Sequence, residues 1–362
     1  MNKEAGYMNI AVLGAGNSGY AMAAHLALSG HKVRLWNRSY STIAELLKTN
    51  TIYCQGAIDG EAKLDLVTTH MDEAVENAEL ILVTTPASAH ADVARQLAKH
   101  IRKPVTIILN PGRTFGALEF NCVLKQCGCT VQPIIAETQS IIYTCRKNSP
   151  ISVIIFTLKK DVLLSTITAN TNKNVIANLP SCLRQFFIPA QSMIQTSIGN
   201  VGMILHCAPA LLNAGWIENE RNSFKYYHDG ITPSIASFLE RLDSERIEVS
   251  QRLGWEVESV TEWMKRSYGA EGDTLYSRIQ DVEAYNIIEA PSTLRHRYLY
   301  EDVPYGLVPL EGMGVRLGLP MEVTGLVIDL ANILLDMDFR KVGRNLEQLD
   351  IIMPTRRVMK GI

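Results

Sequence analysis

The stretch NIAVLGAGNSG, residues 9–19, decides the fold of the first half of the chain. Its first five residues are mostly apolar and predict a buried strand, and a G-x-G-x-x-G pattern overlaps the turn and helix start that follow. The first glycine permits a tight turn, the second lets a phosphate approach the backbone, and the third allows close helix–strand packing. A helix that begins here offers amides and the positive end of its dipole to an anion. The stretch predicts a dinucleotide site with contacts at Gly14, Gly16, Asn17, Ser18 and Gly19.

Apolar runs continue at regular intervals through the first half of the chain. Further strands are predicted at Lys32–Trp36, Leu80–Thr84 and Val105–Leu109, and helices at Ser18–Leu28, Thr42–Lys48 and Ala89–His100. Continuous β-branched runs that alternate with helices are typical of a parallel sheet covered on both faces and built from βαβ units. Ile151–Leu158 is one more predicted strand and a candidate to close this sheet.

The second half of the chain has few strand signals, and from about Gln191 onward it is predicted to be helical. The clearest helix start is Thr232-Pro233, where a capping hydroxyl precedes a proline at the first helical position, and Gly254 offers the stop. The chain has 362 residues, which exceeds the roughly 250–300 residues at which a single core stops growing. We therefore predict an α/β fold with two domains. These are an N-terminal Rossmann dinucleotide-binding domain (1–185) and a C-terminal all-helical substrate and catalytic domain (186–362).

Composition and charge exclude several classes of partner. The formal net charge is -2, which gives no long-range field to attract nucleic acid or an anionic membrane. No apolar run approaches the roughly 18 residues needed to span a bilayer. The seven cysteines are irregularly spaced, and no second pair matches Cys127 and Cys129 as a zinc site would require. We predict reduced thiols, no metal and a cytoplasmic location, with small molecules as partners; a homodimer is compatible with these properties.

The end of the second strand bears on the choice of dinucleotide. An acidic residue about 20 positions after the glycine pattern would bind the ribose 2′-hydroxyl of NAD. This chain has Asn37, Arg38 and Ser39 there instead. A guanidinium can bind a 2′-phosphate through charge-assisted hydrogen bonds, and a serine can donate a further hydrogen bond to it. We predict NADP, with NAD as the alternative cofactor, unless Arg38 is only a surface residue.

Two loops follow the third and fourth predicted strands. Because loops at the carboxyl ends of strands line the cofactor crevice in open α/β sheets, we expect cofactor contacts at Thr85, Pro86 and Asn110. Arg113 belongs to the second loop, Asn110-Pro111-Gly112-Arg113. Its side chain faces the cofactor or the substrate, or it is part of a structural turn; the sequence leaves these alternatives open.

The predicted helical domain offers His206 within the segment GNVGMILH, residues 199–206. A single histidine in an apolar helix is more often a hydrogen-bonded core residue than a catalyst. The segment RYLYEDVPYG, residues 297–306, is rich in polar and aromatic groups that could line a site. Spacing alone does not pair this segment with His206.

Taken together, these segments resemble the octopine/nopaline dehydrogenase family, the opine dehydrogenases, over nearly the whole length of the chain. The resemblance is carried by the glycine pattern, Asn110–Arg113, Asn200–His206, Gly230–Ser234 and Glu301–Pro309. It implies a Rossmann domain joined to a helical domain, with the substrate bound between them. It also implies that an α-keto acid condenses with the amino group of an amino acid. The imine is then reduced to a secondary-amine dicarboxylate by NADPH or NADH.

The resemblance also implies a histidine and an aspartate that handle the proton, at the positions of His206 and Asp302. An ordinary histidine titrates near neutrality, which suits proton exchange in both directions of the reaction. Because the product carries two carboxylates, we expect arginines in its site, first Arg297 and then Arg113. The alternative for Arg297 is an ion pair with a neighbouring acid.

Two other functions compete with this interpretation. A reductase of the ketopantoate or 6-phosphogluconate kind shares the two-domain plan, but such enzymes resemble one another in using a catalytic lysine where this chain offers His206. A non-catalytic dinucleotide-binding sensor would more often have lost His206 or Asp302, and both are present.

Overall fold

The computed structural model describes residues 7–221 and 223–349, which form two compact units. The first, here called the N-terminal unit, comprises the described residues up to Gly112 together with Gly116–Ser197. The second, the helical unit, comprises Arg113–Phe115 and the described residues from Ile198 onward. The division after residue 185 stays a prediction, while the contacts place the main change of unit after Ser197.

The N-terminal unit is built on an eight-stranded sheet. Its strands are β1 (Asn9–Leu13), β2 (Lys32–Trp36), β5 (Leu66–Thr68), β6 (Leu80–Val83), β7 (Thr106–Leu109), β8 (Ile134–Thr138), β11 (Val162–Thr166) and β12 (Phe187–Pro189). Their order is β12-β11-β8-β7-β6-β1-β2-β5. Neighbours from β8 to β5 are parallel, and β11 runs antiparallel to β8. The predicted strands at 9–13 and 32–36 are confirmed, and those beginning at Leu80 and Val105 agree within one residue at each end.

A second, four-stranded sheet was not predicted. It consists of β3 (Thr51–Gly56), β4 (Gly60–Lys63), β9 (Tyr143–Ser149) and β10 (Ser152–Leu158), in the order β4-β3-β10-β9. The prediction that residues 151–158 close the large sheet is therefore wrong. A short connection joins β9 to β10, so the two strands pair locally as an antiparallel hairpin, and the other edge of β10 pairs with β3.

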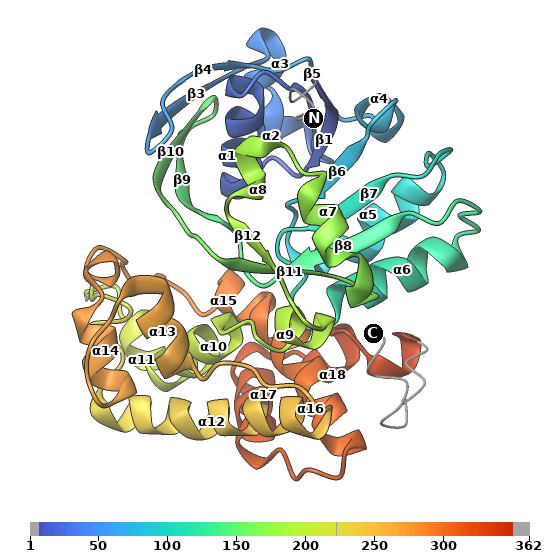
Figure 1. Cartoon of the computed structure of the whole chain (residues 1–362). Helices are drawn as coiled ribbons and strands as arrows, with labels where there is room; N and C mark the ends of the chain where they lie inside the picture. Colours follow the sequence, from blue (N-terminus) through green and yellow to red (C-terminus); the bar gives the residue numbers. More distant parts are fainter. Residues whose placement is uncertain (1–6, 222, 350–362) are drawn as a thin grey trace. The chain divides into compact units, whose positions relative to one another are not determined.

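Helix α1 (Asn17–Leu28) lies between the two sheets (Figure 1). It contacts β1 and β2 of the large sheet and all four strands of the second sheet. A helix covered on several sides is apolar all round, and every residue from Gly19 to Leu26 is buried. This arrangement explains why the helix after the glycine pattern is rich in alanine, whose small side chain lets both sheets approach.

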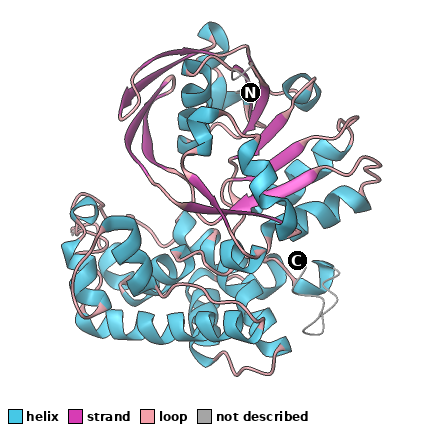
Figure 2. Cartoon of the chain, in the orientation of Figure 1, coloured by secondary structure: helices cyan, strands magenta, loops and turns pink. Residues whose placement is uncertain are grey.

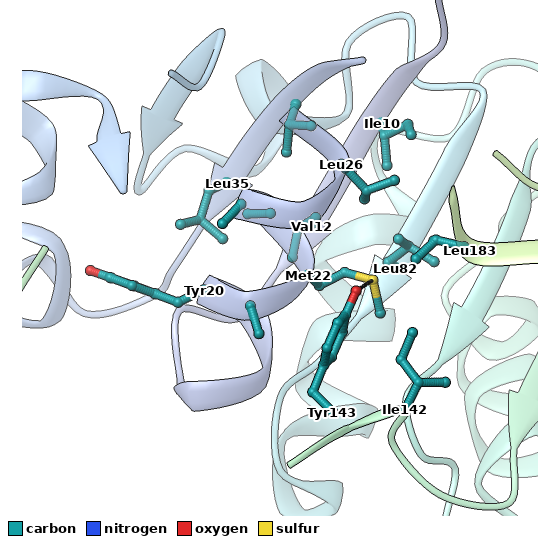
Figure 3. Packing of buried hydrophobic residues seen from close by; sticks show 14 of the residues in the cluster. Ile10, Val12, Tyr20, Met22, Leu26, Leu35, Leu82, Ile142, Tyr143 and Leu183 are labelled. Carbon is teal, nitrogen blue, oxygen red and sulfur yellow. Dashed lines mark hydrogen bonds between the residues drawn. The ribbon is translucent and has the colours of Figure 1, made fainter. Parts of the chain in front are cut away.

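The side chains around α1 form a continuous apolar core. Figure 3 shows Tyr20, Met22 and Leu26 of α1 among residues of several strands. Ile10 and Val12 come from β1. Other strands of both sheets and the residues of the α7–α8 region, such as Leu183, complete the cluster. This packing fixes the position at which α1 begins, and with it the glycine turn.

The remaining helices of the N-terminal unit are shorter. They are α2 (Tyr40–Ile43), α3 (Leu46–Thr49), α4 (Met71–Val75), α5 (His90–Ala98), α6 (Gly116–Gln126), α7 (Asn172–Ala177), α8 (Ser181–Arg184) and α9 (Met193–Ser197). The helix predicted at 42–48 is divided into α2 and α3, whereas the helix predicted at 89–100 is confirmed as α5 within two residues at each end.

The named strands all belong to the N-terminal unit, and the described residues from Ile198 onward fold as helices and loops (Figure 2). The helices are α10 (Gly202–Leu212), α11 (Ala214–Ile217), α12 (Pro233–Arg252), α13 (Val260–Tyr268), α14 (Leu275–Asp281), α15 (Arg297–Tyr300), the π-helical turn η4 (Val303–Leu307), α16 (Val308–Arg316), α17 (Glu322–Leu335) and α18 (Phe339–Val342). The predicted start of α12 is confirmed, because the Thr232 side chain accepts a hydrogen bond from the amide of Ile235. In the described ranges, no helix has the length and apolar character needed to cross a bilayer.

Candidate active site

The helical unit holds a hydrogen-bonded pair made by His206 of α10 and Asp302, which directly precedes η4. The Nδ1 atom of His206 lies 2.8 Å from Oδ2 of Asp302. Asp302 is 1% exposed, whereas the His206 side chain is 17% exposed. The structure thus brings together two residues that the sequence analysis paired only through a family resemblance.

A buried arginine completes the surroundings of this aspartate. Nη1 of Arg113 lies 2.7 Å from Oδ1 of Asp302, and its Nε donates to Oε1 of Glu301 at 3.2 Å. Burial by itself opposes the charge of Asp302, but the Arg113 guanidinium and His206 outweigh it and hold the pKa of Asp302 below its usual range. The site therefore contains a carboxylate that stays ionised despite its burial.

Tyrosines surround the His206 ring. The Tyr227 hydroxyl lies 3.1 Å from Nε2 of His206, and the Tyr298 ring stacks on the imidazole with centroids 4.2 Å apart. The Tyr226 hydroxyl donates to the backbone carbonyl of His206 at 2.5 Å. Burial raises the pKa of Tyr227 well above its ordinary value, so its hydroxyl keeps its proton at neutral pH. Sequence reasoning missed Tyr226 and Tyr227, because adjacent tyrosines with no motif carry no signal of their own.

The two arginines proposed for substrate carboxylates have different environments. The Arg297 side chain is 60% exposed, and its Nε lies 3.7 Å from Oε2 of Glu301. The Arg113 side chain is 8% exposed and is engaged by Asp302 and Glu301. Arg297 is accessible to a small molecule, whereas the guanidinium of Arg113 is occupied by protein groups.

The glycine turn in the N-terminal unit fits a dinucleotide phosphate. Gly14 has φ +114°, which favours glycine. A Cβ at Gly19 would lie 1.8 Å from the carbonyl oxygen of Gly14, so only glycine allows this turn and helix to pack. A Cβ at Gly16 would meet nothing within 4 Å, so the backbone there is open. The Ser18 position follows in the first turn of α1, where amides point toward an anion.

The loops at the strand ends contribute different groups. The Thr85 hydroxyl is buried beside Gly14 and has no hydrogen-bond partner among the described residues, so it is suited to contact a ligand. Pro86 is exposed at the start of the next turn. Asn110 is 4% exposed and donates to the carbonyl of Ile108 at 2.9 Å, an interaction that shapes its own loop.

The loop after β2 carries the residues predicted to choose the dinucleotide. Asn37 accepts a hydrogen bond from the amide of Ala15 at 3.1 Å, which ties this loop to the glycine turn. The Arg38 side chain is 71% exposed and lies 3.7 Å from an Asp92 carboxylate oxygen. The hydroxyls of Ser39 and Ser41 are 2.9 Å apart, so Ser41 adds a group that the sequence analysis missed.

Lys147 of β9 also lies beside the glycine turn. Its backbone amide donates to the Asn17 side chain at 3.0 Å, and its Nζ reaches the carbonyl of Ala15 at 3.4 Å. The ammonium lies 3.6 Å from the centre of the Tyr20 ring, and burial lowers the pKa of Lys147. Sequence reasoning missed this lysine because β9 was not predicted.

In the described part of the chain, no group of three or more acidic, histidine or cysteine side chains could hold a metal ion.

The sheet, the glycine turn and the histidine–aspartate pair define an NAD(P)-dependent oxidoreductase. Comparison with known proteins agrees with this class for both halves of the chain. Residues 9–111 match the family model of the NAD-dependent glycerol-3-phosphate dehydrogenase N-terminus. Residues 189–335 match the model of the NAD/NADP octopine/nopaline dehydrogenase alpha-helical domain.

Full-length relatives identify the family. The chain is 39% identical over 342 residues to an opine dehydrogenase of Arthrobacter sp. (strain 1C), covering 94% of each protein. Its fold is similar to that of an octopine dehydrogenase solved with NADH and agmatine (TM-score 0.77, 18% identity, 97% of each chain). It is also similar to a yersinopine dehydrogenase solved with NADP+ (TM-score 0.78, 16% identity, 98% and 97% of the two chains).

The chain belongs to the opine dehydrogenase family. The function expected from the resemblance, NAD(P)H-dependent reductive condensation of an α-keto acid with an amino acid, is confirmed at the level of the family. The two competing functions, a ketopantoate or 6-phosphogluconate type of reductase and a non-catalytic sensor, are not favoured.

Proposed function

We propose that His206 exchanges the proton at the reacting nitrogen and that Asp302 orients and stabilises the imidazole. The observation that carries this proposal is the 2.8 Å contact between Nδ1 of His206 and a fully buried, ionised Asp302. A carboxylate on Nδ1 fixes the tautomer and the orientation of the ring, as it does in serine-protease triads. The other ring nitrogen, Nε2, contacts the Tyr227 hydroxyl at 3.1 Å and is the atom that would exchange the proton.

The chemistry requires such a proton donor. Condensation of the amino group with the keto acid releases water and gives an imine. A reduced nicotinamide cofactor, bound through the glycine turn at Gly14–Gly19, would supply the hydride for the imine carbon. The imine nitrogen must gain a proton when the carbon gains the hydride, and the same proton must leave when the product is oxidised. His206 gives this proton in one direction and takes it back in the other, while Tyr298 and Tyr227 keep its ring in place.

We propose that Arg297 binds a substrate carboxylate. Its exposed guanidinium lies on α15, five positions before Asp302, and its ion-pair partner among the described residues is Glu301, at 3.7 Å. A planar guanidinium can form two parallel hydrogen bonds with a carboxylate. Octopine dehydrogenase has been solved with L-arginine and with pyruvate, and we extend to this chain the same two classes of substrate, an amino acid and an α-keto acid.

We propose NADPH as the preferred cofactor, bound at the glycine turn, Thr85 and the loop after β2. The support is the exposed Arg38 and the neighbouring hydroxyls of Ser39 and Ser41, together with the lack of an acidic residue at positions 37–39. A cytoplasmic location is proposed as well, because all seven cysteines are free thiols.

The proposed function is tested by measuring oxidation of NADPH and NADH against a matrix of α-keto acids and amino acids. The expected result is turnover that requires one member of each class, with a secondary-amine dicarboxylate as the product detected by mass spectrometry. Reduction of a keto acid to a hydroxy acid without any amine would contradict the proposal.

A further inference from the structure

The strongest unexplained feature of the site is the buried arginine beside the histidine–aspartate pair. Asp302 can accept a hydrogen bond from Nδ1 of His206 and stabilise a protonated ring only as a carboxylate. At 1% exposure, a carboxylate without a countercharge would take up a proton rather than stay ionised. Some group must therefore compensate its charge in both states of the histidine.

Arg113 has the geometry for this task. Its Nη1 lies 2.7 Å from Oδ1 of Asp302, the oxygen that does not face His206. Nε donates to Glu301 at 3.2 Å, and Nη1 also donates to the Asn200 side chain at 3.2 Å. Hydrogen bonds to Glu301 and Asn200 thus fix the orientation of the planar guanidinium, which holds its positive charge against Oδ1 of Asp302 as an ion pair.

Binding of substrate by Arg113 is disfavoured by the same contacts. A substrate carboxylate on this guanidinium would have to displace Asp302 or Glu301, which would leave a buried carboxylate without its partner. The 8% exposure of the Arg113 side chain contrasts with the 60% exposure of Arg297. The roles of the two arginines therefore divide between support of the pair and contact with substrate.

We propose that Arg113 is a positioning residue, which keeps Asp302 ionised and turned so that Oδ2 faces His206. This inference rests on the proposed function of the pair. Arg113 follows the Asn110–Gly112 loop of the N-terminal unit but belongs by its contacts to the helical unit. Its φ of +60° is uncommon for a residue with a side chain, and here it accompanies the turn that presents the guanidinium to Asp302.

Gly202 supplies an independent observation. A Cβ at this position would lie 2.8 Å from Nη1 of Arg113 and 3.0 Å from Oδ1 of Asn200. A side chain at the first position of α10 would therefore push the guanidinium away from Asp302. Helix α10, which carries His206, therefore begins with a glycine at the position where a side chain would collide with the Arg113 guanidinium.

The electrostatic surroundings agree with this role. Burial alone disfavours the charged form of Asp302, and the charge of Arg113 is the largest single influence that lowers its pKa again. The ionisable groups that face Asp302 or act on it are Arg113, Glu301, His206, Cys207, Tyr226, His296, Arg297 and Tyr298. Among these groups, Arg113 is the permanently charged cation in direct contact with the carboxylate, whereas His206 on the other oxygen is charged only when protonated.

The test uses the full-length enzyme with Arg113→Met and Arg113→Lys, and Arg252→Met on the exposed face of α12 as the control. Arg113→Met is expected to lower kcat about tenfold to hundredfold, less than loss of the histidine, because it acts through that group. The KM for the keto acid and the Kd for NADPH should change by less than about threefold. The acid limb of the kcat profile should move to higher pH, since Asp302 loses the charge that lowers its pKa. Arg252→Met should match the wild type.

A double variant separates positioning from a general structural effect. In an Asp302→Asn background the carboxylate of the pair is gone, and Glu301 keeps Arg297 as a second cation at 3.7 Å. Adding Arg113→Met should therefore cost less than about threefold more in kcat. If Arg113→Met does not fold, the inference is tested with Arg113→Lys, which keeps the positive charge beside Asp302. Arg113→Lys should leave the pH of the acid limb of the kcat profile unchanged. It should lower kcat by a few-fold, because lysine lacks the planar guanidinium that makes several oriented hydrogen bonds.

Two results would overturn the inference: wild-type kcat with an unchanged pH profile in either Arg113 variant, or a large rise in the KM for the keto acid with unchanged kcat. A His206→Ala enzyme of full activity would instead refute the proposed function itself. The two failures are thus distinguishable.

Discussion

His206 and Asp302 are 96 positions apart in the chain, yet Nδ1 of the histidine lies 2.8 Å from Oδ2 of the aspartate. The aspartate is buried and ionised, while the histidine remains partly exposed. The proton exchange proposed above uses Nε2, the ring nitrogen that does not face the carboxylate.

The first prediction follows from this contact. His206→Ala should lower kcat about a hundredfold to ten-thousandfold, the usual contribution of an acid–base group. The Kd for NADPH should stay nearly unchanged, since the glycine turn belongs to the other unit. Asp302→Asn should also lower kcat, and the double variant should lose much less than the product of the two single losses if the residues act together. Rapid turnover by a folded His206→Ala enzyme would contradict the mechanism.

The second prediction concerns Arg38. Arg38→Ala should weaken NADPH binding by about tenfold to hundredfold, because a charge-assisted contact contributes roughly 1.5–3 kcal/mol. NADH binding should change little, since NADH has no 2′-phosphate. Fluorescence titration with both reduced cofactors measures the effect, and Lys48→Ala, an exposed lysine of the same unit, serves as the control. Equal losses for the two cofactors would refute the assignment.

The third prediction concerns Arg297. Arg297→Lys should raise the KM for one carboxylate substrate by about tenfold, because lysine keeps the charge but lacks the planar fork. The kcat should change much less than in His206→Ala. Arg295→Lys is a matched control, since Arg295 is exposed and contacts the Tyr300 hydroxyl at 3.3 Å. Unchanged steady-state kinetics in Arg297→Lys would show that the residue only pairs with Glu301.

The fourth prediction concerns Lys147, which lies beside the glycine turn. Lys147→Met should weaken NADH and NADPH binding by the same factor, about tenfold, because both cofactors carry the pyrophosphate expected at the start of α1. The difference from wild type should shrink as salt is added, since the ammonium is only half-buried. Lys147→Arg should restore most of the affinity. An effect confined to NADPH would place Lys147 near the 2′-phosphate instead.

The fifth prediction concerns pH and the core of the N-terminal unit. Burial lowers the pKa of His25 to about 4, and its Nδ1 lies 3.0 Å from the Tyr143 hydroxyl. The folded pKa is below the unfolded value of 6.5, so the unfolded chain binds more protons as the pH falls. Stability from this group is present above pH 6.5 and is lost as the pH falls from 6.5 toward 4. Between pH 7 and pH 5 the loss is about 2 kcal/mol.

His25→Gln removes this titration. The difference in free energy of unfolding between wild type and variant should therefore change by about 2 kcal/mol in favour of the variant when the pH falls from 7 to 5. Urea unfolding at the two pH values measures it, and His70→Gln, at an exposed position, is the control. A difference that is independent of pH would mean that folding does not lower the pKa of His25.

The parts of the fold that the sequence predicts are those governed by local signals. The strand before Gly14, the helix after it and the start of α12 at Thr232 follow from apolar patterning and from residues that permit a turn or cap a helix. The four-stranded sheet could not be predicted in the same way. Its β9 is largely polar, and β10 pairs with β3 about a hundred positions earlier, which no local pattern records.

The same division applies to the candidate site. The glycine turn could be derived from spacing, because its residues are neighbours in the chain. His206 could be connected with Asp302 only through a family resemblance, and the role of Arg113 stayed open because its partner Glu301 is 188 positions away. Lys147 was not predicted as a site residue because it lies on β9, a strand that the sequence analysis did not predict.

The assignment of Arg113–Phe115 to the helical unit means that the two units cannot be separated by one cut in the chain. A fragment ending at Ser197 would carry Arg113 away from Asp302, and the complementary fragment would keep a buried carboxylate without its cation. The same holds for recombination between relatives. A single crossover near residue 197 would combine the arginine loop of one parent with the aspartate of another, so functional chimeras of this family should be those in which both parents place matching side chains at these two positions.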